Sequence, residues 1–284
     1  MSIIVTGASG QLGRLVIEEL LAKVPASEVT ALVRDPGKAT GLAARGMVIA
    51  VADYNSPESL DGLLRAGDRV LLISGNEFHR DRTAQHKAVL GAAAKAGVAL
   101  FAYTSAPGLQ SGPVTDDHRA TEDAILASGI PYSLLRNGLY HEMATMNIPA
   151  ALQHGAVVRA AGNGRLASAA RGDYAAAAAA VLSGDGHEDT VYELTGDTAW
   201  SFAEFAAEVS RQSGRDVPYR AVTGEEYAGM LSGAGLPDQL AHIMAGIDAS
   251  IAAGELAHTT GDLSRLAGRP TTPVADAIAA ALVS

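Results

Sequence analysis

The chain has 284 residues, 48% of them hydrophobic and 18% charged, which is enough apolar material for a large α/β fold and argues against disorder. Its net charge of -10 argues against nucleic acid as a partner, because phosphate backbones are bound by patches of Lys and Arg. The lack of cysteine excludes disulfides, thiolate metal sites and cysteine nucleophiles, and the lack of a basic leader or long apolar run predicts a cytoplasmic protein with no membrane span.

A glycine-rich turn follows the first apolar run. Ile3–Thr6 is typical of a buried strand; Gly7, Gly10 and Gly13 follow, and an amphipathic stretch starts at Leu15. This order lets backbone N–H groups and the positive end of a helix face a phosphate. The three glycines permit a tight turn, close approach of a pyrophosphate and close helix packing. The pattern predicts a dinucleotide site; the alternative is a strand–turn–helix unit with incidental glycines.

Apolar runs then alternate with helical patterns. The further predicted strands are 29–33, 47–51, 70–73, 100–104 and 132–135. The helices predicted between them are 38–45, 57–65, 82–96 and 117–127. Gly67, Gly97 and Gly129 stand where helix C-caps are expected. This alternation predicts a Rossmann-type doubly wound parallel sheet.

The regularity weakens after residue 137. We expect residues 1–136 to form an NAD(P)-binding Rossmann domain and residues 137–284 a smaller, mostly helical α/β lobe for the substrate, with parts of 137–200 returning to the first domain. In this half we predict a hairpin that pairs 156–159 with 165–168 around Gly162–Gly164, and helix N-caps at Asp173 and Ser201. We also predict strands near 191–195 and 217–220. Helices are expected from 223 to 283, with breaks at 235–237 and 268–270.

Arg34 ends the second predicted strand, where NAD-specific domains place a carboxylate for the ribose 2′-hydroxyl. An Arg there offers a planar donor fork to a 2′-phosphate, and Lys38 is close enough in sequence to assist. The sequence therefore predicts NADP rather than NAD. The alternative is a solvated Arg at a strand end, and the neighbouring carboxylate of Asp35 complicates the prediction.

Polar residues also follow the next three strands. Asp53 lies where the adenine end of a dinucleotide is expected, or else it caps a helix near Pro57. Ser74–Asn76 contains Gly75, which permits close approach near the middle of the cofactor. Tyr103–Ser105 places hydroxyls beside the nicotinamide, or these are ordinary polar groups at a strand end.

Lysine is scarce. Short-chain dehydrogenases use a Tyr-x-x-x-Lys pair, in which the Lys lowers the pKa of the tyrosine for proton transfer. The lysines here are Lys23, Lys38, Lys87 and Lys95, and no tyrosine has one at that spacing. The missing acid argues against an alcohol or ketone dehydrogenase. It argues much less against hydride transfer to a quinone, because a conjugated acceptor can take its proton from water.

Asn137–Glu142 leaves the sixth strand at the carboxyl edge of the sheet. Cofactor and substrate are expected to meet there, so we take Tyr140 and His141 as candidate catalytic residues in a substrate pocket. The alternative is a helix start with a surface His and Glu.

Other charged residues are less specific. His118 and Glu122 share one helix face and either line the pocket or form a surface pair. Arg171 is placed to reach a phosphate or the substrate, whereas Arg159 and Arg165 are expected in solvent. No cluster of residues has metal-ligand spacing, so we expect no metal.

Several segments resemble the NmrA-like atypical short-chain dehydrogenase/reductase family. The shared segments are Thr6–Gly13, Val33–Lys38 and Ala102–Ser105. The segments that are similar to one bacterial group in it, the type 2 NADPH:quinone oxidoreductases, are Leu134–Tyr140, Arg171–Ala175 and Gly268–Thr272.

The resemblance implies an NADPH-dependent reductase of quinones that needs no flavin. The cofactor contacts that it implies are Gly7, Ala8, Ser9, Gly10, Gln11, Leu12, Arg34, Ser74, Gly75, Asn76, Asn137, Gly138, Leu139, Tyr140, His141, Glu142 and Arg171. The family usually has a serine run at the turn that starts with Ser74, and Gly75 and Asn76 depart from it.

We therefore expect an enzyme that transfers a hydride from NADPH to a small-molecule quinone, and we allow for a homodimer. An alternative is an NADP(H)-binding, redox-sensing regulator with little turnover. A reductase of another small carbonyl compound or enone stays open, because the pocket residues are not diagnostic.

Overall fold

The structure, a computed structural model, describes residues 2–75, 81–107 and 113–283. The chain divides into two compact units, and both are built from segments that are distant in sequence. Unit 1 comprises Met1–Asn137, Gly172–Leu194 and Arg265–Arg269, and unit 2 comprises Gly138–Arg171, Thr195–Ser264 and Pro270–Ser284.

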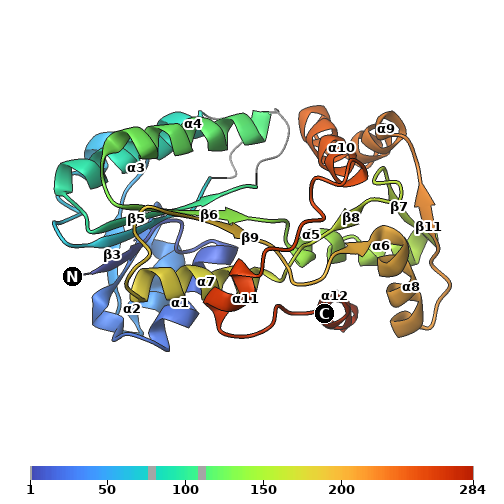
Figure 1. Cartoon of the computed structure of the whole chain (residues 1–284), viewed down its shortest axis with the longest axis horizontal. Coiled ribbons are helices and arrows are strands. Elements are labelled where there is room, and N and C mark those ends of the chain that lie inside the picture. Colours follow the sequence, from blue (N-terminus) through green and yellow to red (C-terminus); the bar gives the residue numbers. More distant parts are fainter. Residues whose placement is uncertain (1, 76–80, 108–112, 284) are drawn as a thin grey trace. The chain divides into compact units, whose positions relative to one another are not determined.

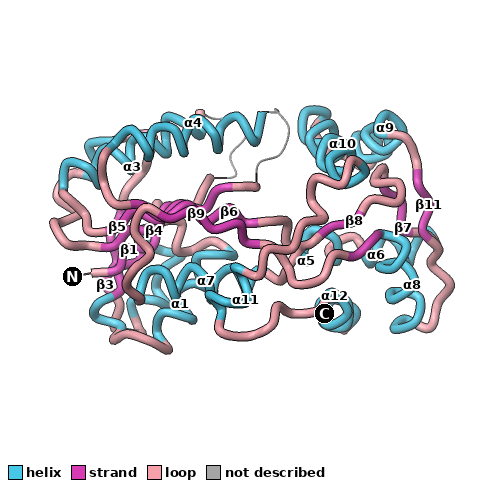
Figure 2. Tube along the Cα trace, in the orientation of Figure 1, coloured by secondary structure: helices cyan, strands magenta, loops and turns pink. Residues whose placement is uncertain are grey.

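Unit 1 contains a seven-stranded parallel sheet in the order β3-β2-β1-β4-β5-β6-β9, drawn in magenta in Figure 2. Its strands are β1 (Ile3–Val5), β2 (Val29–Val33), β3 (Val48–Val51), β4 (Arg69–Leu72), β5 (Leu100–Ser105), β6 (Tyr132–Asn137) and β9 (Thr190–Leu194). Every residue of β1, β2, β4 and β5 is buried, as expected for strands covered on both faces. The doubly wound parallel sheet predicted from the sequence is confirmed.

Helices cover both faces of this sheet. In Figure 1, α3 (Arg82–Ala96) and α4 (Pro113–Ser128) lie on one face, and α1 (Gln11–Leu21) and α7 (Arg171–Ser183) lie on the other. Strand β1 pairs with β2 on one side and β4 on the other, so the strand order reverses between β1 and β4. Ligands of open α/β sheets bind outside the carboxyl ends of the strands at such a switch point.

Two predicted helices of unit 1 are shorter than expected. The stretch 38–45 forms the 3₁₀ turn η2 (Pro36–Ala39) followed by the one-turn helix α2 (Thr40–Ala43). The stretch 57–65 forms only the 3₁₀ turn η3 (Pro57–Leu60). Asp61 is already extended, with a ψ of 127°, and so ends the helical winding before Gly62, whose φ is 74°.

Unit 2 has shorter elements. They are α5 (His141–Thr145), α6 (Ile148–His154), β7 (Val157–Arg159), β8 (Arg165–Leu166), β10 (Trp200–Ser201), α8 (Phe202–Ser213), β11 (Tyr219–Ala221), α9 (Gly224–Gly233), α10 (Asp238–Ala252) and α12 (Val274–Leu282), while α11 (Asp262–Ala267) crosses the division between the units. The cap predicted at Ser201 is confirmed, because Ser201 and Glu204 form a reciprocal capping box at the start of α8.

The predicted hairpin around Gly162–Gly164 is wrong. Strand β7 pairs in parallel with β11, and β8 pairs antiparallel with β10. A Cβ on Gly164 would lie 2.0 Å from the carbonyl oxygen of Ile251. The turn therefore packs against the end of α10 instead of joining two paired strands.

Asp173 is not the N-cap of α7, because the helix already begins at Arg171. Its carboxylate is fully buried and pairs with Arg269.

Over the described residues, no helix has the length and apolar character needed to cross a membrane.

Candidate cofactor and substrate site

The turn after β1 forms a tight cradle of backbone. Gly7 adopts a φ of 57°, which glycine tolerates best, and the Gly10 N–H donates to the Gly7 carbonyl at 2.9 Å. Helix α1 starts directly after Gly10 with no acidic residue in its first turn. Its first N–H groups, on Gln11 and Leu12, therefore belong to a helix end that favours an anion.

Gly13 is required by packing in this cradle. An added Cβ would lie 2.3 Å from the Gly7 carbonyl oxygen and 2.8 Å from the Ala8 Cα. Both atoms belong to the backbone, so neither can yield without moving the turn. The close approach of α1 to the glycine turn thus depends on the missing side chain at residue 13.

Arg34 lies exposed at the carboxyl end of β2, the strand next to β1. Asp35 caps the following turn η2 by accepting a hydrogen bond from the Gly37 N–H at 2.9 Å. The carboxylate of Asp35 therefore has a structural role of its own as the cap of η2. Its place next to Arg34 has this explanation and does not require a contact with the cofactor. Lys38 is exposed within the same turn.

The turn after β4 lies on the other side of the switch point. The Ser74 N–H donates to Thr104 Oγ1 at 2.8 Å, and the Gly75 N–H donates to His86 Nε2 at 3.1 Å. The Gly75 carbonyl accepts from Arg82 Nε at 2.8 Å. Asn76, the third predicted residue of this turn, lies outside the described residues.

Asn137 ends β6 with an unsatisfied polar atom. Its side chain is 9% exposed, and its Oδ1 is buried and accepts no hydrogen bond from any residue that the structure describes. Buried polar groups in native proteins nearly always have a partner. The orphaned oxygen at the carboxyl end of a central strand is therefore suited to accept a hydrogen bond from a ligand such as the carboxamide of a nicotinamide.

Residues that follow Asn137 gather around Arg171 in unit 2. The guanidinium of Arg171 lies 4.6 Å from the ring centroid of Tyr140. The carboxylate of Glu142 accepts from the Arg171 backbone N–H at 3.0 Å, and its distance to the guanidinium is 3.9 Å. Arg171, Tyr140 and Glu142 thus form one connected group, and Gly138 and Leu139 precede it in the chain.

His141, in the same segment, contacts two other parts of unit 2 through its ring nitrogens. Its Nε2 lies 2.9 Å from the Thr272 carbonyl oxygen and its Nδ1 lies 2.8 Å from Ser168 Oγ. A carbonyl oxygen only accepts, so Nε2 donates; Trp200 Nε1 donates to the same Ser168 hydroxyl, which is then free to donate to Nδ1. The ring is 2% exposed, and both of its nitrogens are engaged.

Other predictions about polar residues have definite outcomes. Asp53 accepts from the backbone and side chain of Asn55 and so shapes its own turn instead of capping η3. His118 and Glu122 are both 8% exposed, so the surface-pair alternative is wrong. Arg159 is 6% exposed and paired with Asp248, against the expectation that it is solvated.

Some residues around the site were missed from the sequence. Tyr54 is held near the glycine turn: burial raises its pKa, and hydrogen bonds to Thr6 and the backbone of Gly7 oppose that rise. Arg82 and His86, which anchor Gly75, were also missed. Their spacing of i and i+4 at the start of the helix after Gly75 was the available signal.

The parallel sheet, the glycine cradle and the orphaned amide oxygen together define a dinucleotide-binding protein of the Rossmann class. The chain belongs to the NAD(P)H-binding family, whose model matches residues 7–185. It is similar to quinone oxidoreductase 2 of Escherichia coli strain K12, with 46% identity over 278 residues that span 97% of each chain.

Solved structures show the same likeness. The crystal structure of the E. coli NADPH-dependent quinone oxidoreductase QOR2 complexed with NADPH matches with a TM-score of 0.95 and 45% identity, over 99% of this chain and 100% of that one. The Citrobacter sp. triphenylmethane reductase complexed with NADP(H) matches with a TM-score of 0.93 and 40% identity, over 99% and 100% of the two chains.

An NmrA-like family domain-containing oxidoreductase of Aspergillus flavus is 28% identical over 300 residues, which span 100% of this chain and 95% of that protein. The family resemblance predicted from the motifs is confirmed by these relatives.

Proposed function

We propose that the protein is an NADPH-dependent reductase that transfers a hydride to quinones. The observation that carries the proposal is the likeness, along nearly the whole chain, to a protein named NADPH-dependent quinone oxidoreductase. The residues present fit the cofactor: the missing side chain at Gly13 lets the start of α1 lie close against the turn after β1, and Asn137 holds an orphaned buried oxygen. When bound, NADPH supplies the hydride from its nicotinamide ring.

Residues of unit 1 bind the cofactor in this proposal. The backbone from Gly7 to Leu12 binds the pyrophosphate, with Ala8, Ser9 and Gln11 between the glycines and the helix start. Arg34 binds the 2′-phosphate and selects NADPH over NADH. The Ser74–Gly75 turn contacts the middle of the cofactor, and Asn137 Oδ1 accepts from the carboxamide.

Residues of unit 2 serve the substrate. Tyr140 offers its ring to a flat quinone, and Arg171 and Glu142 hold that ring in place. His141 positions the segment through its bonds to Ser168 and Thr272. The quinone takes its proton from water, so the chain has no need of a Tyr-x-x-x-Lys pair; the protein positions the reactants and excludes solvent.

The test is a steady-state assay of NADPH oxidation with several benzoquinones and naphthoquinones, without added flavin. We expect one hydroquinone formed for each NADPH oxidised. Tyr140→Ala is expected to raise the KM for the quinone, whereas Met146→Ala, at a 74% exposed residue just after α5, is the matched control. Tight NADP binding with no turnover above background across all quinones would instead indicate the redox-sensing regulator.

The homodimer and the cytoplasmic location stay predictions. Light scattering of the purified protein, with and without NADPH, measures the first of them.

A further inference from the structure

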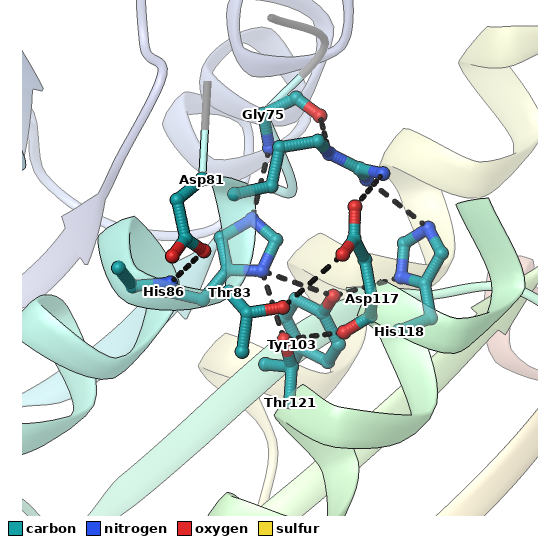
Figure 3. Close-up of polar contacts among 10 residues, drawn as sticks. Gly75, Asp81, Thr83, His86, Tyr103, Asp117, His118 and Thr121 are labelled. Atoms are coloured by element: carbon teal, nitrogen blue, oxygen red, sulfur yellow. Dashed lines mark hydrogen bonds and ion pairs between the residues drawn. The ribbon is translucent and has the colours of Figure 1, made fainter. Parts of the chain in front are cut away.

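The backbone of Gly75 is held at both of its polar groups, the N–H and the carbonyl. Its N–H donates to His86 Nε2 at 3.1 Å, and its carbonyl accepts from Arg82 Nε at 2.8 Å. Both partners lie on α3, four residues apart. Figure 3 shows the contact between Gly75 and His86 as a dashed line. The turn after β4 is therefore fixed by side chains and not only by its own backbone.

These two side chains belong to a polar cluster with Tyr103, Asp117, His118 and Thr121, in which all members but the partly exposed Asp117 are buried. His86 Nδ1 lies 3.0 Å from Thr121 Oγ1 and 3.4 Å from the Tyr103 hydroxyl, which in turn lies 2.7 Å from His118 Nδ1. The cluster thus joins α3, β5 and α4 in the interior of unit 1.

The cluster ties the position of Arg82 to α4. Arg82 is 3% exposed, and its guanidinium donates to Asp117 Oδ2 at 3.2 Å. Thr83 Oγ1 donates to the other oxygen of the same carboxylate. A buried Arg held in this way can present Nε to the Gly75 carbonyl in one orientation only, because its planar fork is fixed by the ion pair.

The direction of each hydrogen bond defines the state of His86. A backbone N–H can only donate, so His86 Nε2 must be unprotonated to accept from Gly75, and the ring proton lies on Nδ1 toward Thr121. Thr121 Oγ1 donates to the Asp117 carbonyl at 2.8 Å, which leaves its lone pairs free to accept. Burial, together with Arg82, lowers the pKa of His86 to about 3, so the ring stays neutral in ordinary buffers.

We propose that His86 is a positioning residue for the cofactor: its Nε2 holds the N–H of Gly75 while Arg82 holds the carbonyl, and together they fix the backbone of Gly75 and so set the affinity for NADPH. The inference rests on the proposed function, in which the Ser74–Gly75 turn contacts the cofactor. A turn that spends part of its time in other conformations binds its ligand more weakly, in proportion to the fraction of molecules in the binding conformation. A turn that is already held in that conformation avoids this loss of affinity. His86 itself need not touch NADPH.

Three variants at one residue test this role. His86→Gln keeps an acceptor near the position of Nε2, His86→Asn places its acceptor near Nδ1, and His86→Leu has none. We expect the Kd for NADPH to rise about tenfold in the Asn and Leu variants, because the partly buried N–H of Gly75 loses its acceptor, and to stay within about twofold in the Gln variant. The kcat with a saturating quinone should change by less than about twofold, since no group at the reacting atoms is altered.

The pattern separates positioning from general instability. A merely destabilised protein loses active molecules, which lowers the apparent kcat and leaves the Kd of the folded fraction unchanged. Equal Kd values for all variants and the wild type would overturn the proposal, as would an equal rise for all three. Failure of the wild type to oxidise NADPH with quinones would count against the proposed function itself.

A measurement on the wild type keeps the test independent of folding of the variants. Hydrogen exchange followed by NMR on the protein without ligand reports the Gly75 N–H directly. Anchored to His86, it should exchange at least about a hundredfold more slowly than an open-chain amide. Exchange at the open-chain rate would overturn the anchor.

Discussion

At the scale of single residues, we expect Arg34 to select NADPH over NADH. It is exposed at the end of β2, where NAD-specific domains place a carboxylate, and the neighbouring Asp35 accepts a hydrogen bond from the Gly37 N–H. Arg34→Asp should raise the Kd for NADPH about 10- to 100-fold, because a charge-assisted contact is replaced by repulsion, and change the Kd for NADH little. Fluorescence titration with both dinucleotides measures this selectivity.

Arg65→Asp is the matched control for Arg34→Asp. It alters the net charge by the same amount at another exposed residue of unit 1. Both Kd values should stay near those of the wild type. Equal loss of NADPH and NADH affinity in Arg34→Asp would contradict the role of Arg34.

The two buried histidines make stability depend on pH. Burial and Arg82 lower the pKa values of His86 and His118 from 6.5 to about 3. Between these values the unfolded chain binds protons that the folded chain does not, so the free energy of unfolding falls as the pH falls from about 6.5 toward 3. The slope is roughly 1.4 kcal/mol per pH unit for each histidine at most.

Urea unfolding at a series of pH values measures this slope. His86→Gln and His118→Gln should each reduce the loss of stability between neutral and mildly acidic pH, because the substituted side chain does not titrate. His242→Gln, at an exposed histidine, is the control and should keep the wild-type slope. An unchanged slope in both buried variants would rule out this origin.

At the scale of elements, the approach of α1 to the glycine turn depends on one missing side chain. Gly13→Ala would place a Cβ 2.3 Å from the Gly7 carbonyl oxygen, and so should lower the free energy of unfolding by roughly 1–3 kcal/mol and weaken NADPH binding. Gly91→Ala makes the same change in an exposed part of α3, where the added Cβ would meet no neighbouring atom within 4 Å. This variant should leave the free energy of unfolding unchanged or raise it by about 0.4–1 kcal/mol.

Chemical denaturation of the two alanine variants gives the comparison directly. If Gly13→Ala proved as stable as Gly91→Ala, α1 would not pack against the turn as described. Loss of stability with unchanged NADPH affinity would separate packing from the phosphate cradle.

The elements that the sequence predicted well are those with strong local signals. Helix α3 spans the predicted residues 82–96, and α8 follows its predicted Ser201 cap. The weak points were short pieces whose pairing is not local. Strand β7 finds its partner β11 about sixty residues along the chain, and nothing in the turn at Gly162–Gly164 indicates that choice.

At the scale of the whole molecule, unit 2 is assembled from distant segments by a buried ion pair. Arg159 of β7 pairs with Asp248 of α10, which is fully buried and also accepts from the Ala160 N–H at 2.7 Å. Asp248→Asn leaves the guanidinium uncompensated and should lower the free energy of unfolding by about 3–5 kcal/mol.

Asp61→Asn is the comparison for Asp248→Asn. Asp61 pairs with Lys95 at 2.9 Å, but both side chains are largely exposed, so its loss should cost less than about 1 kcal/mol. Hydrogen exchange in Asp248→Asn should speed up first in unit 2. Equal stability of the two variants would show that burial of Asp248 is not what matters.

The sequence by itself predicted the sheet and the glycine cradle, and it led us to expect a preference for NADP at Arg34. Each of these depends on residues close together in the chain, where periodicity, turn chemistry and strand ends act locally. Only the tertiary structure showed how Asn137, His141, Asp173 and Arg159 are buried and paired, and it assembled the cluster that holds Gly75. Burial and pairing between distant segments set whether a polar side chain is solvated, hydrogen-bonded or without a partner. The residues next to it in the sequence do not indicate which of these applies.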